Sequence, residues 1–345
     1  MSTNLQIRDN ALYNFNYQDL IEDRLELFTD EKEDMLQAFA ADVVTGLESD
    51  QKYLLPKYFY DNEGSVLFDQ ITTTPEYYPT RTEKALLHSS LNELLDRIKG
   101  IEALVELGSG TSEKTHVLLR DLIFNRRSMR YVPVDVSDII IESSKSLIEQ
   151  YDNLRITGII ADYEAGLSVL PYLEEKCKLL LFLGSSIGNL NRSERNLLLG
   201  QINDALDPGD HVLIGFDLVK DIHVLQAAYN DRAGITRNFN MNLLKRINRE
   251  LGGEFNLDLF EHHAFFNEAA SRIEMHLIST RDQTVRIANL NREFSFSAGE
   301  SIHTENSFKF TDQMILELIT KTGFSHVRTW KDPGAYFALT LIRSR

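Results

Sequence analysis

Short apolar runs alternate with amphipathic, helix-like stretches through the middle of this chain. The runs that are typical of β-strands occupy residues 103–107, 130–134, 156–160, 179–183 and 211–216. Stretches with helical spacing precede the first run at about 83–99 and then lie between the runs, near 113–124, 137–150 and 191–206. Strands that alternate with helices form parallel sheets joined by right-handed crossovers. The pattern therefore predicts an α/β fold with a parallel sheet.

Local signals mark the ends of several of these elements. Asn191 followed by Glu194 is a capping-box pattern. Near the C-terminus, Thr311 predicts an N-cap, and Gly323 stands where the residue after a helix end belongs. Two further strands follow, at about 326–330 and 336–342. A last helix and a two-stranded hairpin after five parallel strands predict a seven-stranded, mostly parallel sheet.

The alternation stops between residues 217 and 308. A helix at about 237–250 and antiparallel strands at 272–279 and 284–288 predict a smaller α+β domain there. The larger domain would then comprise residues 37–216 and 309–345. We expect residues 1–36 to form a helical segment that packs with the smaller domain, because the first 50 residues are acidic and Phe39, Val43 and Leu47 have helical spacing. Residues 58–83 are aromatic and are predicted to be loop-like.

Composition and charge limit the possible partners. The chain has 345 residues and a net charge of −16, without a block of lysine or arginine. We therefore expect neither nucleic-acid nor anionic-membrane partners. The longest apolar runs are too short to span a bilayer, and the polar N-terminus lacks a signal-peptide pattern. The single cysteine, Cys177, fits a reducing compartment and is predicted to be a small core residue. We expect a cytoplasmic monomer.

A glycine turn follows the first of the five strands. Gly108-Ser109-Gly110 connects the run 103–107 to a helical pattern, as in nucleotide-binding α/β sheets. Glu113 stands where both the P-loop and the dinucleotide fingerprint require a glycine, and its carboxylate would oppose a phosphate. S-adenosylmethionine carries no phosphate, so the turn suits this ligand. A purely structural turn remains the alternative.

Polar residues follow the next two strands, at the sheet edge where open α/β folds bind ligands. Asp135, about 27 residues beyond Gly108, could accept hydrogen bonds from both ribose hydroxyls, or could cap the next helix. Asp162 could accept a hydrogen bond from an adenine amino group, with the ring of Tyr163 beside it. The alternative for this pair is an ordinary turn.

The loop after the fourth strand, Gly184-Ser185-Ser186-Ile187-Gly188-Asn189, allows two interpretations. Its glycines permit close approach, and Asn189 offers a donor and an acceptor to a small polar substrate. The same residues nearly match the nucleophile elbow of serine hydrolases, with Ser186 as nucleophile. Asp217 and later histidines (His223, His262, His263, His276, His303) would then have to supply the acid and base. Without an H-E-x-x-H motif or a cysteine–histidine cluster, the sequence predicts no metal site.

Several longer segments resemble the S-adenosylmethionine-dependent histidine Nα-methyltransferases, which form hercynine (histidine betaine) on the way to ergothioneine. The segments that carry this resemblance are 58–83 (with Pro-Glu-Tyr-Tyr-Pro-Thr-Arg-Thr-Glu), 105–115, 131–136, 182–190, 229–240 and 272–277 (Arg-Ile-Glu-Met-His-Leu). The resemblance extends from about residue 35 to the C-terminus. It implies a class I, Rossmann-like methyltransferase domain that binds S-adenosylmethionine, and a smaller substrate-recognition domain that selects L-histidine.

The resemblance also implies site residues. The positions that contact the cofactor in this family are Tyr60, Gly108, Lys114, Asp135, Asp162 and Tyr163. Those that contact the substrate are Tyr77, Gly184, Asn189, Tyr229, Met275, Glu305 and Ser307. Glu305 and Ser307 read the imidazole ring in the family, which favours histidine over tryptophan-type substrates. Relatives often carry Gly-Gly-Thr where this chain has Gly184-Ser185-Ser186. The remaining alternatives are another aromatic amine as substrate, a serine hydrolase, and a non-catalytic binding module.

Overall fold

The computed structural model describes residues 15–345 except 22, 31–34, 111, 113 and 125–127. The chain divides into two compact units. Unit 1 comprises the described residues of Met1–Lys32 together with Arg81–Leu218 and Phe310–Arg345. Unit 2 comprises those of Glu33–Thr80 together with Val219–Lys309. This division differs from the predicted domains mainly in two places, because residues 37–80 belong to unit 2 and residues 15–30 to unit 1.

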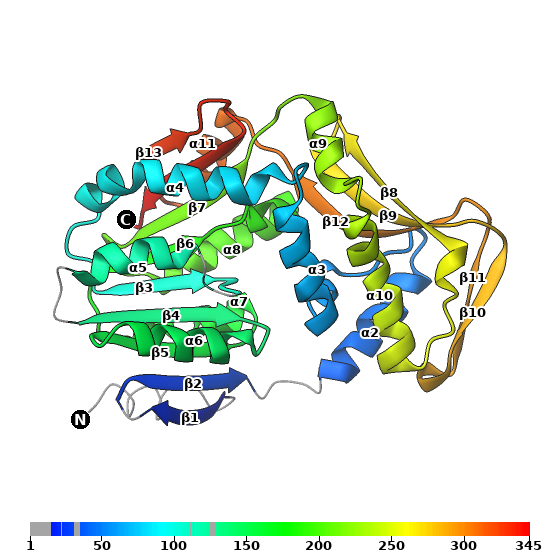
Figure 1. Ribbon diagram of the computed structural model, residues 1–345, viewed down its shortest axis with the longest axis horizontal. Helices are drawn as coiled ribbons and strands as arrows, with labels where there is room; N and C mark the ends of the chain where they lie inside the picture. Colours follow the sequence, from blue (N-terminus) through cyan, green and yellow to red (C-terminus); the bar gives the residue numbers. More distant parts are fainter. Residues whose placement is uncertain (1–14, 22, 31–34, 111, 113, 125–127) are drawn as a thin grey trace. The chain divides into compact units, whose positions relative to one another are not determined.

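Unit 1 is built on one mostly parallel sheet (Figure 1). Neighbouring strands follow the order β1 (Phe15–Ile21), β2 (Leu25–Asp30), β5 (Leu154–Ile160), β4 (Met129–Asp135), β3 (Ala103–Leu107), β6 (Lys178–Phe182), β7 (His211–Asp217), β14 (Phe337–Arg343) and β13 (Ser325–Lys331). The pairs from β2 to β7 are parallel, and the outer pairs are antiparallel. The five predicted parallel strands and the C-terminal hairpin are confirmed. The described residues form nine strands in this sheet, two more than predicted.

The two additional strands correct the prediction for the N-terminal segment. Phe15–Ile21 and Leu25–Asp30 are the strands β1 and β2 and are not helical, whereas α2 (Met35–Glu48) is a helix as predicted. Strand β2 extends the parallel sheet beside β5 and buries Leu25, Leu27 and Phe28. This strand is stabilised by pairing with β5, about 130 residues away in the sequence. The acidic composition of the N-terminal segment gives no sign of this long-range pairing.

Helices cover both faces of the unit 1 sheet. Residues of α4 (Tyr78–Arg97), α5 (Thr115–Phe124) and α6 (Ile139–Gln150) share one apolar core with the sheet. The short helix α7 (Tyr163–Leu167) contacts β4 and α8 (Arg192–Ala205), and α8 contacts α11 (Asp312–Lys321). Asn191 and Glu194 form the predicted capping box, and Thr311 caps α11. Gly323 has a φ of +83°, the left-handed conformation expected after a helix end.

Cys177 is not a core residue. Its side chain is exposed, whereas Lys178, the first residue of β6, is buried. The apolar run that made Cys177 look internal begins after it, and Lys178 is buried because Asp207 and Asp210 pair with its ammonium group.

Unit 2 contains two small antiparallel sheets and their helices (Figure 1). The three-stranded sheet has the order β12 (Ser301–Phe308), β9 (Arg272–Ser279) and β8 (Phe260–Asn267), and β10 (Gln283–Ile287) pairs with β11 (Arg292–Phe296). Helices α9 (Ile222–Tyr229) and α10 (Ile235–Leu251) contact β8 and β9. The predicted helix at 237–250 and the strands at 272–279 and 284–288 are confirmed by α10, β9 and β10.

The segment 58–83 is largely helical and not loop-like. It contains the end of η1 (Pro56–Phe59), all of α3 (Asn62–Thr73) and the beginning of α4. Asp61 begins α3, because its side chain accepts a hydrogen bond from the backbone N–H of Gly64 (2.7 Å). The aromatic residues that suggested a loop pack against one another within unit 2. Across the described ranges, none of the helices is long and apolar enough to cross a membrane.

A β-bulge in β12 determines which side chains share a face of the three-stranded sheet. His303 pairs with His276, but the register shifts by one residue and Glu305 then pairs with Met275. Ser307 pairs with Ile273, two residues before Met275. Directly opposed residues point to the same side of a sheet. Glu305, Ser307 and Met275 therefore lie on one face.

Candidate functional site

In unit 1, the predicted cofactor residues lie at the carboxyl edge of the sheet. Asp135 is the last residue of β4, and Gly108, Asp162 and Gly184 follow β3, β5 and β6. The order of the strands reverses between β3 and β6, because β4 and β5 lie on one side of β3 and β6 and β7 on the other. Ligands of open α/β sheets bind at such a switch point.

The glycine turn is held close to the end of β4. Gly108 and Gly110 both have positive φ, at +70° and +48°, which glycine adopts at little cost. The N–H of Gly110 donates to Oδ2 of Asp135 (2.9 Å). A Cβ added to Gly108 would lie 3.1 Å from the Tyr163 hydroxyl, so the turn fits tightly over this side chain. Thr111 and Glu113 of the same motif lie outside the described residues.

Asp135 does not cap the helix that follows it. Helix α6 begins after Asp138, and the second oxygen of Asp135 accepts a hydrogen bond from Ser137 N (3.0 Å). Burial raises the pKa of Asp135, and the hydrogen bonds from Gly110 and Ser137 oppose that rise. The carboxylate is thus fixed at the sheet edge by two backbone donors, and each oxygen retains capacity for further hydrogen bonds.

Asp162 and Tyr163 stand together at the end of β5. Asp162 is the N-cap of α7, because its Oδ1 accepts a hydrogen bond from Ala165 N (2.8 Å). It therefore has a structural role, as the alternative interpretation expected. Its side chain is exposed. The Tyr163 ring packs edge-on against Phe182 (5.5 Å between centroids). Burial, with a contribution from Asp135, raises the pKa of Tyr163, which keeps its hydroxyl protonated.

Glu83 joins two of the predicted site segments and was missed from the sequence. Its carboxylate accepts hydrogen bonds from Lys114 Nζ (2.6 Å) and from the backbone N–H of Gly184 (2.8 Å). Glu83 is 1% exposed. Oε1 of Glu83 also lies 2.3 Å from where a Cβ on Gly215 would be, so β7 needs a glycine there. The available signal was the Thr-Arg-Thr-Glu end of the segment 58–83, to which no role was assigned.

The loop after β6 does not have the geometry of a nucleophile elbow. The residue with the strained backbone is Ser185 (φ +57°), and its hydroxyl accepts a hydrogen bond from the buried N–H of Asp217 (2.9 Å). The Ser186 hydroxyl donates to the Leu183 carbonyl (3.1 Å). Within the part of the chain that the structure describes, no histidine hydrogen-bonds to Ser186. The hydrolase hypothesis is therefore not supported. Asn189, at the end of η3 (Ser186–Asn189), is partly buried.

In unit 2, the predicted aromatic residues form a continuous series. Tyr60 packs against Phe68 (5.6 Å between centroids), Phe68 against Tyr77 (6.2 Å), and Tyr77 against Tyr229 (6.4 Å). All three contacts are edge-to-face, the arrangement that aromatic quadrupoles favour. The structure thus brings together three tyrosines from distant parts of the sequence.

The last tyrosine of this series connects to β12 through hydroxyl groups. The Tyr229 hydroxyl donates to Ser307 Oγ (2.7 Å). Lys309, which no sequence argument singled out, donates from Nζ to Ser307 Oγ (2.7 Å) and to the Tyr229 hydroxyl (3.1 Å). Lys309 is fully buried. A buried lysine next to the predicted substrate residues is the main feature that the sequence did not reveal.

Glu305 lies on the same face of β12 and has an unusual pKa. Burial raises the pKa of its carboxyl from a usual value near 4.5 to about 7, and the Lys309 ammonium opposes the rise. Within the described ranges, the Glu305 side chain forms no hydrogen bond or ion pair. A carboxyl group that is desolvated without a partner is poised to accept a hydrogen bond from a ligand.

The opposite face of the same sheet carries a cluster that the sequence did not predict. Glu274, His276 and His303 each offer a ligand atom within 4.8 Å of the others. They lie on the neighbouring strands β9 and β12, and His276 and His303 are far apart in the sequence. The sequence-based expectation of no metal site therefore did not include them. Glu274 is already paired with Arg272 (2.7 Å) and accepts a hydrogen bond from Asn267 (2.8 Å), and these partners compete with a cation.

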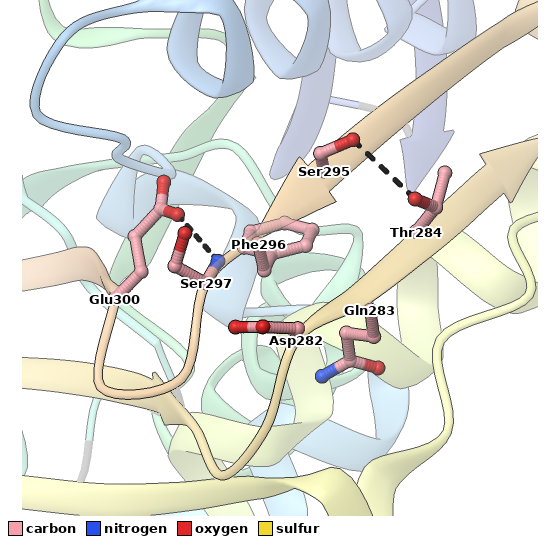
Figure 2. Close-up of a pocket in the computed structure, with 7 residues that line it drawn as sticks. All are labelled: Asp282, Gln283, Thr284, Ser295, Phe296, Ser297 and Glu300. Carbon is pink, nitrogen blue, oxygen red and sulfur yellow. Dashed lines mark hydrogen bonds between the residues drawn. The ribbon is translucent and has the colours of Figure 1, made fainter.

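A separate surface pocket lies at the start of β10 and the end of β11 (Figure 2). Thr284 and Ser295 are hydrogen-bonded across the two strands (3.3 Å), and the N–H of Ser297 donates to Glu300 (2.8 Å). The pocket contains none of the predicted site residues. It is therefore distinct from the candidate site.

The topology of unit 1 defines the class of protein. A parallel sheet in the order β5-β4-β3-β6-β7, completed by the antiparallel strands β14 and β13, is the sheet of the class I, Rossmann-like methyltransferases. Residues 39–344 match the model of the family described as histidine-specific, S-adenosylmethionine-dependent methyltransferases. The chain belongs to this family.

Individual relatives agree with this membership. The chain is 43% identical to the histidine N-alpha-methyltransferase of Mycolicibacterium smegmatis and 42% identical to that of Mycobacterium tuberculosis. Each match covers 88% of this chain and 94% of the relative. It is also 31% identical to ergothioneine biosynthesis protein 1 of Neurospora crassa, over 83% of this chain and 32% of that protein.

Proposed function

We propose that this protein transfers methyl groups from S-adenosylmethionine to the α-amino nitrogen of L-histidine. The observation that carries the proposal is that Glu305 and Ser307 lie on one face of β12, in a member of a histidine-specific family. An imidazole ring has one nitrogen that donates and one that accepts a hydrogen bond. A carboxylate and a hydroxyl on the same strand face match these two nitrogens.

The carboxyl edge of the unit 1 sheet suits S-adenosylmethionine. Asp135 would accept hydrogen bonds from the ribose hydroxyls, and Asp162 with Tyr163 would hold the adenine. Lys114, oriented by Glu83, would attract the carboxylate of the cofactor beside Gly108. We include Tyr60 from the resemblance, as an aromatic face for the positively charged sulfonium. These donors and acceptors require no phosphate, in agreement with a cofactor that has none.

The substrate residues form a second set, which the resemblance assigns. We propose that Glu305 and Ser307 bind the imidazole, with Met275 packing beside it on the same face. Tyr77 and Tyr229 would hold the amino-acid part of the substrate. From the loop after β6, Gly184 and Asn189 would contribute close backbone approach and an amide group.

Methyl transfer to an amine requires a specific geometry and an unprotonated nitrogen. S-adenosylmethionine, once bound, supplies a methyl group on a positively charged sulfur. The site must hold the amine lone pair about 3 Å from this methyl group and in line with the sulfur. An ammonium group has no lone pair, so the amine must lose its proton before each transfer, and we propose that water carries the proton away. The aromatic faces of Tyr60 and Tyr77 favour the growing cation.

We further propose that three transfers occur and yield hercynine, in the biosynthesis of ergothioneine. A trimethylated nitrogen donates no hydrogen bond, so a site with aromatic faces around the amine tolerates it better than one built from fixed acceptors. We propose that the protein acts in the cytoplasm, in agreement with its single cysteine, and that it is a monomer.

Incubation with S-adenosylmethionine and each free aromatic amino acid, followed by mass spectrometry, tests the proposal. We expect histidine to gain the mass of one, two and then three methyl groups. Tryptophan and tyrosine should gain none under the same conditions. Methylation of tryptophan in preference to histidine, or no transfer to any amino acid, would overturn the proposal. Fragmentation of the product separates methylation of the α-nitrogen from methylation of the ring.

A further inference from the structure

We propose that Lys309 is a specificity-determining positioning residue, which restricts the Ser307 hydroxyl to donating a hydrogen bond. The inference rests on the proposed function, in which Ser307 and Glu305 bind the substrate ring. It adds the chemical class of the ring that the site accepts. This ring must present an acceptor atom to Ser307 and an N–H group to Glu305.

The position of Lys309 is fixed from both its backbone and its side chain. Its backbone N–H donates to the Ser271 carbonyl (2.8 Å), and its own carbonyl accepts from the Ser271 hydroxyl (2.9 Å). Its ammonium group is fully buried and lies 2.7 Å from Ser307 Oγ and 3.1 Å from the Tyr229 hydroxyl. Burying a charged group is costly unless polar partners surround it. An isosteric apolar side chain would fill this space at lower cost, so a functional role is the better explanation.

The hydrogen bonds that Ser307 accepts determine where its own proton can be donated. A serine oxygen has two lone pairs and one proton. An ammonium group can only donate, so Lys309 occupies one lone pair. The phenol of Tyr229 is a stronger donor than an alkyl hydroxyl, and its bond to Ser307 (2.7 Å) occupies the second. The Ser307 proton remains for a ligand, and the oxygen cannot accept from one.

Glu305 supplies the complementary half of the recognition. Its carboxylate, when ionised, accepts hydrogen bonds and cannot donate, and the Lys309 charge favours the ionised form. Together, Ser307 and Glu305 match a neutral imidazole, which has one acceptor nitrogen and one N–H. An indole has an N–H but no acceptor nitrogen. A ring without the acceptor would leave the buried Ser307 proton unpaired, which is the arrangement that gives strong discrimination.

Replacing Lys309 with an apolar residue of similar shape should weaken this discrimination. In Lys309→Met, the Ser307 oxygen loses one of its two donors, and the Tyr229 hydroxyl loses the ammonium group that donates to it. The serine can then turn its proton away from a ring that has no acceptor. The variant should therefore tolerate such rings, whereas loss of packing alone would weaken all substrates equally.

The experiment compares histidine with the two pyrrolylalanine isomers, which each keep one ring N–H and replace the other nitrogen with C–H. The measured quantity is the ratio of kcat/KM for histidine to kcat/KM for the better isomer. We expect this ratio to fall about tenfold or more in Lys309→Met, with the affinity for S-adenosylhomocysteine unchanged. The control is Lys52→Met, which removes a lysine of unit 2 that is ion-paired with Glu300 and should leave the ratio unchanged.

An unchanged ratio in a folded Lys309→Met variant would overturn the inference. Should that variant not fold, Lys309→Gln serves instead, because its amide oxygen can accept the Ser307 proton and should lower the ratio in the same way. An unchanged ratio in that variant would equally refute the role of Lys309. Failure of the wild-type protein to methylate histidine would refute the proposed function separately. Calorimetric titration with histidine and the isomers would then still measure the ratio as a binding preference.

Discussion

Substitution of Glu305 by glutamine should weaken histidine use and, at the same time, make stability less sensitive to pH. Glutamine keeps the shape of the side chain and an acceptor oxygen, but it removes the charge. The change therefore separates the contribution of the carboxylate charge from that of packing. Activity should fall, whereas stability relative to wild type should rise as the pH increases. This combination distinguishes a residue held for function from one held for structure.

The loss in activity follows from the kind of hydrogen bond. A bond to a charged group contributes about 1.5–3 kcal/mol and a neutral one about 0.5–1.5 kcal/mol. Replacing the Glu305 carboxylate with an amide should thus cost about 1–2 kcal/mol of binding, a roughly 5- to 30-fold decrease in kcat/KM for histidine. The affinity for S-adenosylmethionine should not change, because we assign Glu305 to the substrate.

The effect on stability follows from the raised pKa. The pKa of Glu305 is about 7 in the folded protein, against a usual value near 4.5. Between these values the folded chain holds a proton that the unfolded chain releases, so stability falls as the pH rises through this interval. The difference corresponds to an upper limit of roughly 3 kcal/mol. The free energy of unfolding of Glu305→Gln relative to wild type should increase by up to this amount between pH 4.5 and pH 7.

Two measurements check the reasoning. Denaturant titrations at several pH values give the relative stability, and initial rates with histidine give kcat/KM. Asp282, an exposed acid of the same unit that lines the separate surface pocket, supplies the control Asp282→Asn, which should change neither quantity. If the relative stability of Glu305→Gln is the same at both ends of the pH range, the pKa of Glu305 is not raised in the folded protein and this reasoning is wrong. Unchanged kcat/KM would refute its role in binding histidine.

Three further predictions concern unit 1. Asp135→Ala should raise KM for S-adenosylmethionine about 10-fold or more and KM for histidine far less, because it removes the acceptor for the ribose hydroxyls; equal changes would count against this role. Glu83→Gln should lower the melting temperature and weaken cofactor binding, since it removes the ion pair of Lys114 and weakens the anchor of Gly184; calorimetry with S-adenosylhomocysteine measures the second effect, and unchanged affinity would contradict it. Ser186→Ala should retain methyl transfer, and a fluorophosphonate probe should not label the wild-type protein; labelling at Ser186 would revive the hydrolase hypothesis.

The parallel sheet could be predicted because its strands carry a strong sequence signal. Strands buried on both faces read as continuous apolar runs, and β3, β6 and β7 are buried along almost their whole length. Once the strands are placed, topology alone brings their carboxyl ends to one edge. Gly108, Asp135 and Gly184 were therefore accessible to sequence reasoning.

The elements that were predicted wrongly depend on distant partners or on a weak local signal. Strand β2 is held in the sheet by pairing with β5, and β1 by pairing with β2. Asp61 is a local signal for helix α3, because it is the N-cap, but the aromatic composition of this segment favours a loop. Glu83 accepts a hydrogen bond from Gly184, 101 residues away in the sequence, and Lys309 donates one to Tyr229, 80 residues away. Neither spacing has a periodicity that a sequence pattern could reveal.

The face on which Glu305 lies shows most clearly why part of the site needs a structure. With regular alternation after the pair of His303 and His276, Glu305 would lie opposite Glu274 and point to the other face of the sheet. Two carboxylates would then face each other, which is unfavourable between directly opposed residues. The bulge inserts one residue, Thr304, whose hydroxyl lies within hydrogen-bond distance of two acceptors, Asn240 Oδ1 (2.7 Å) and the Met275 carbonyl (3.0 Å), and shares its one proton between them. These hydrogen bonds stabilise the shifted register, so a buried threonine on the strand determines that the carboxylate of Glu305 lies on the same face as Ser307.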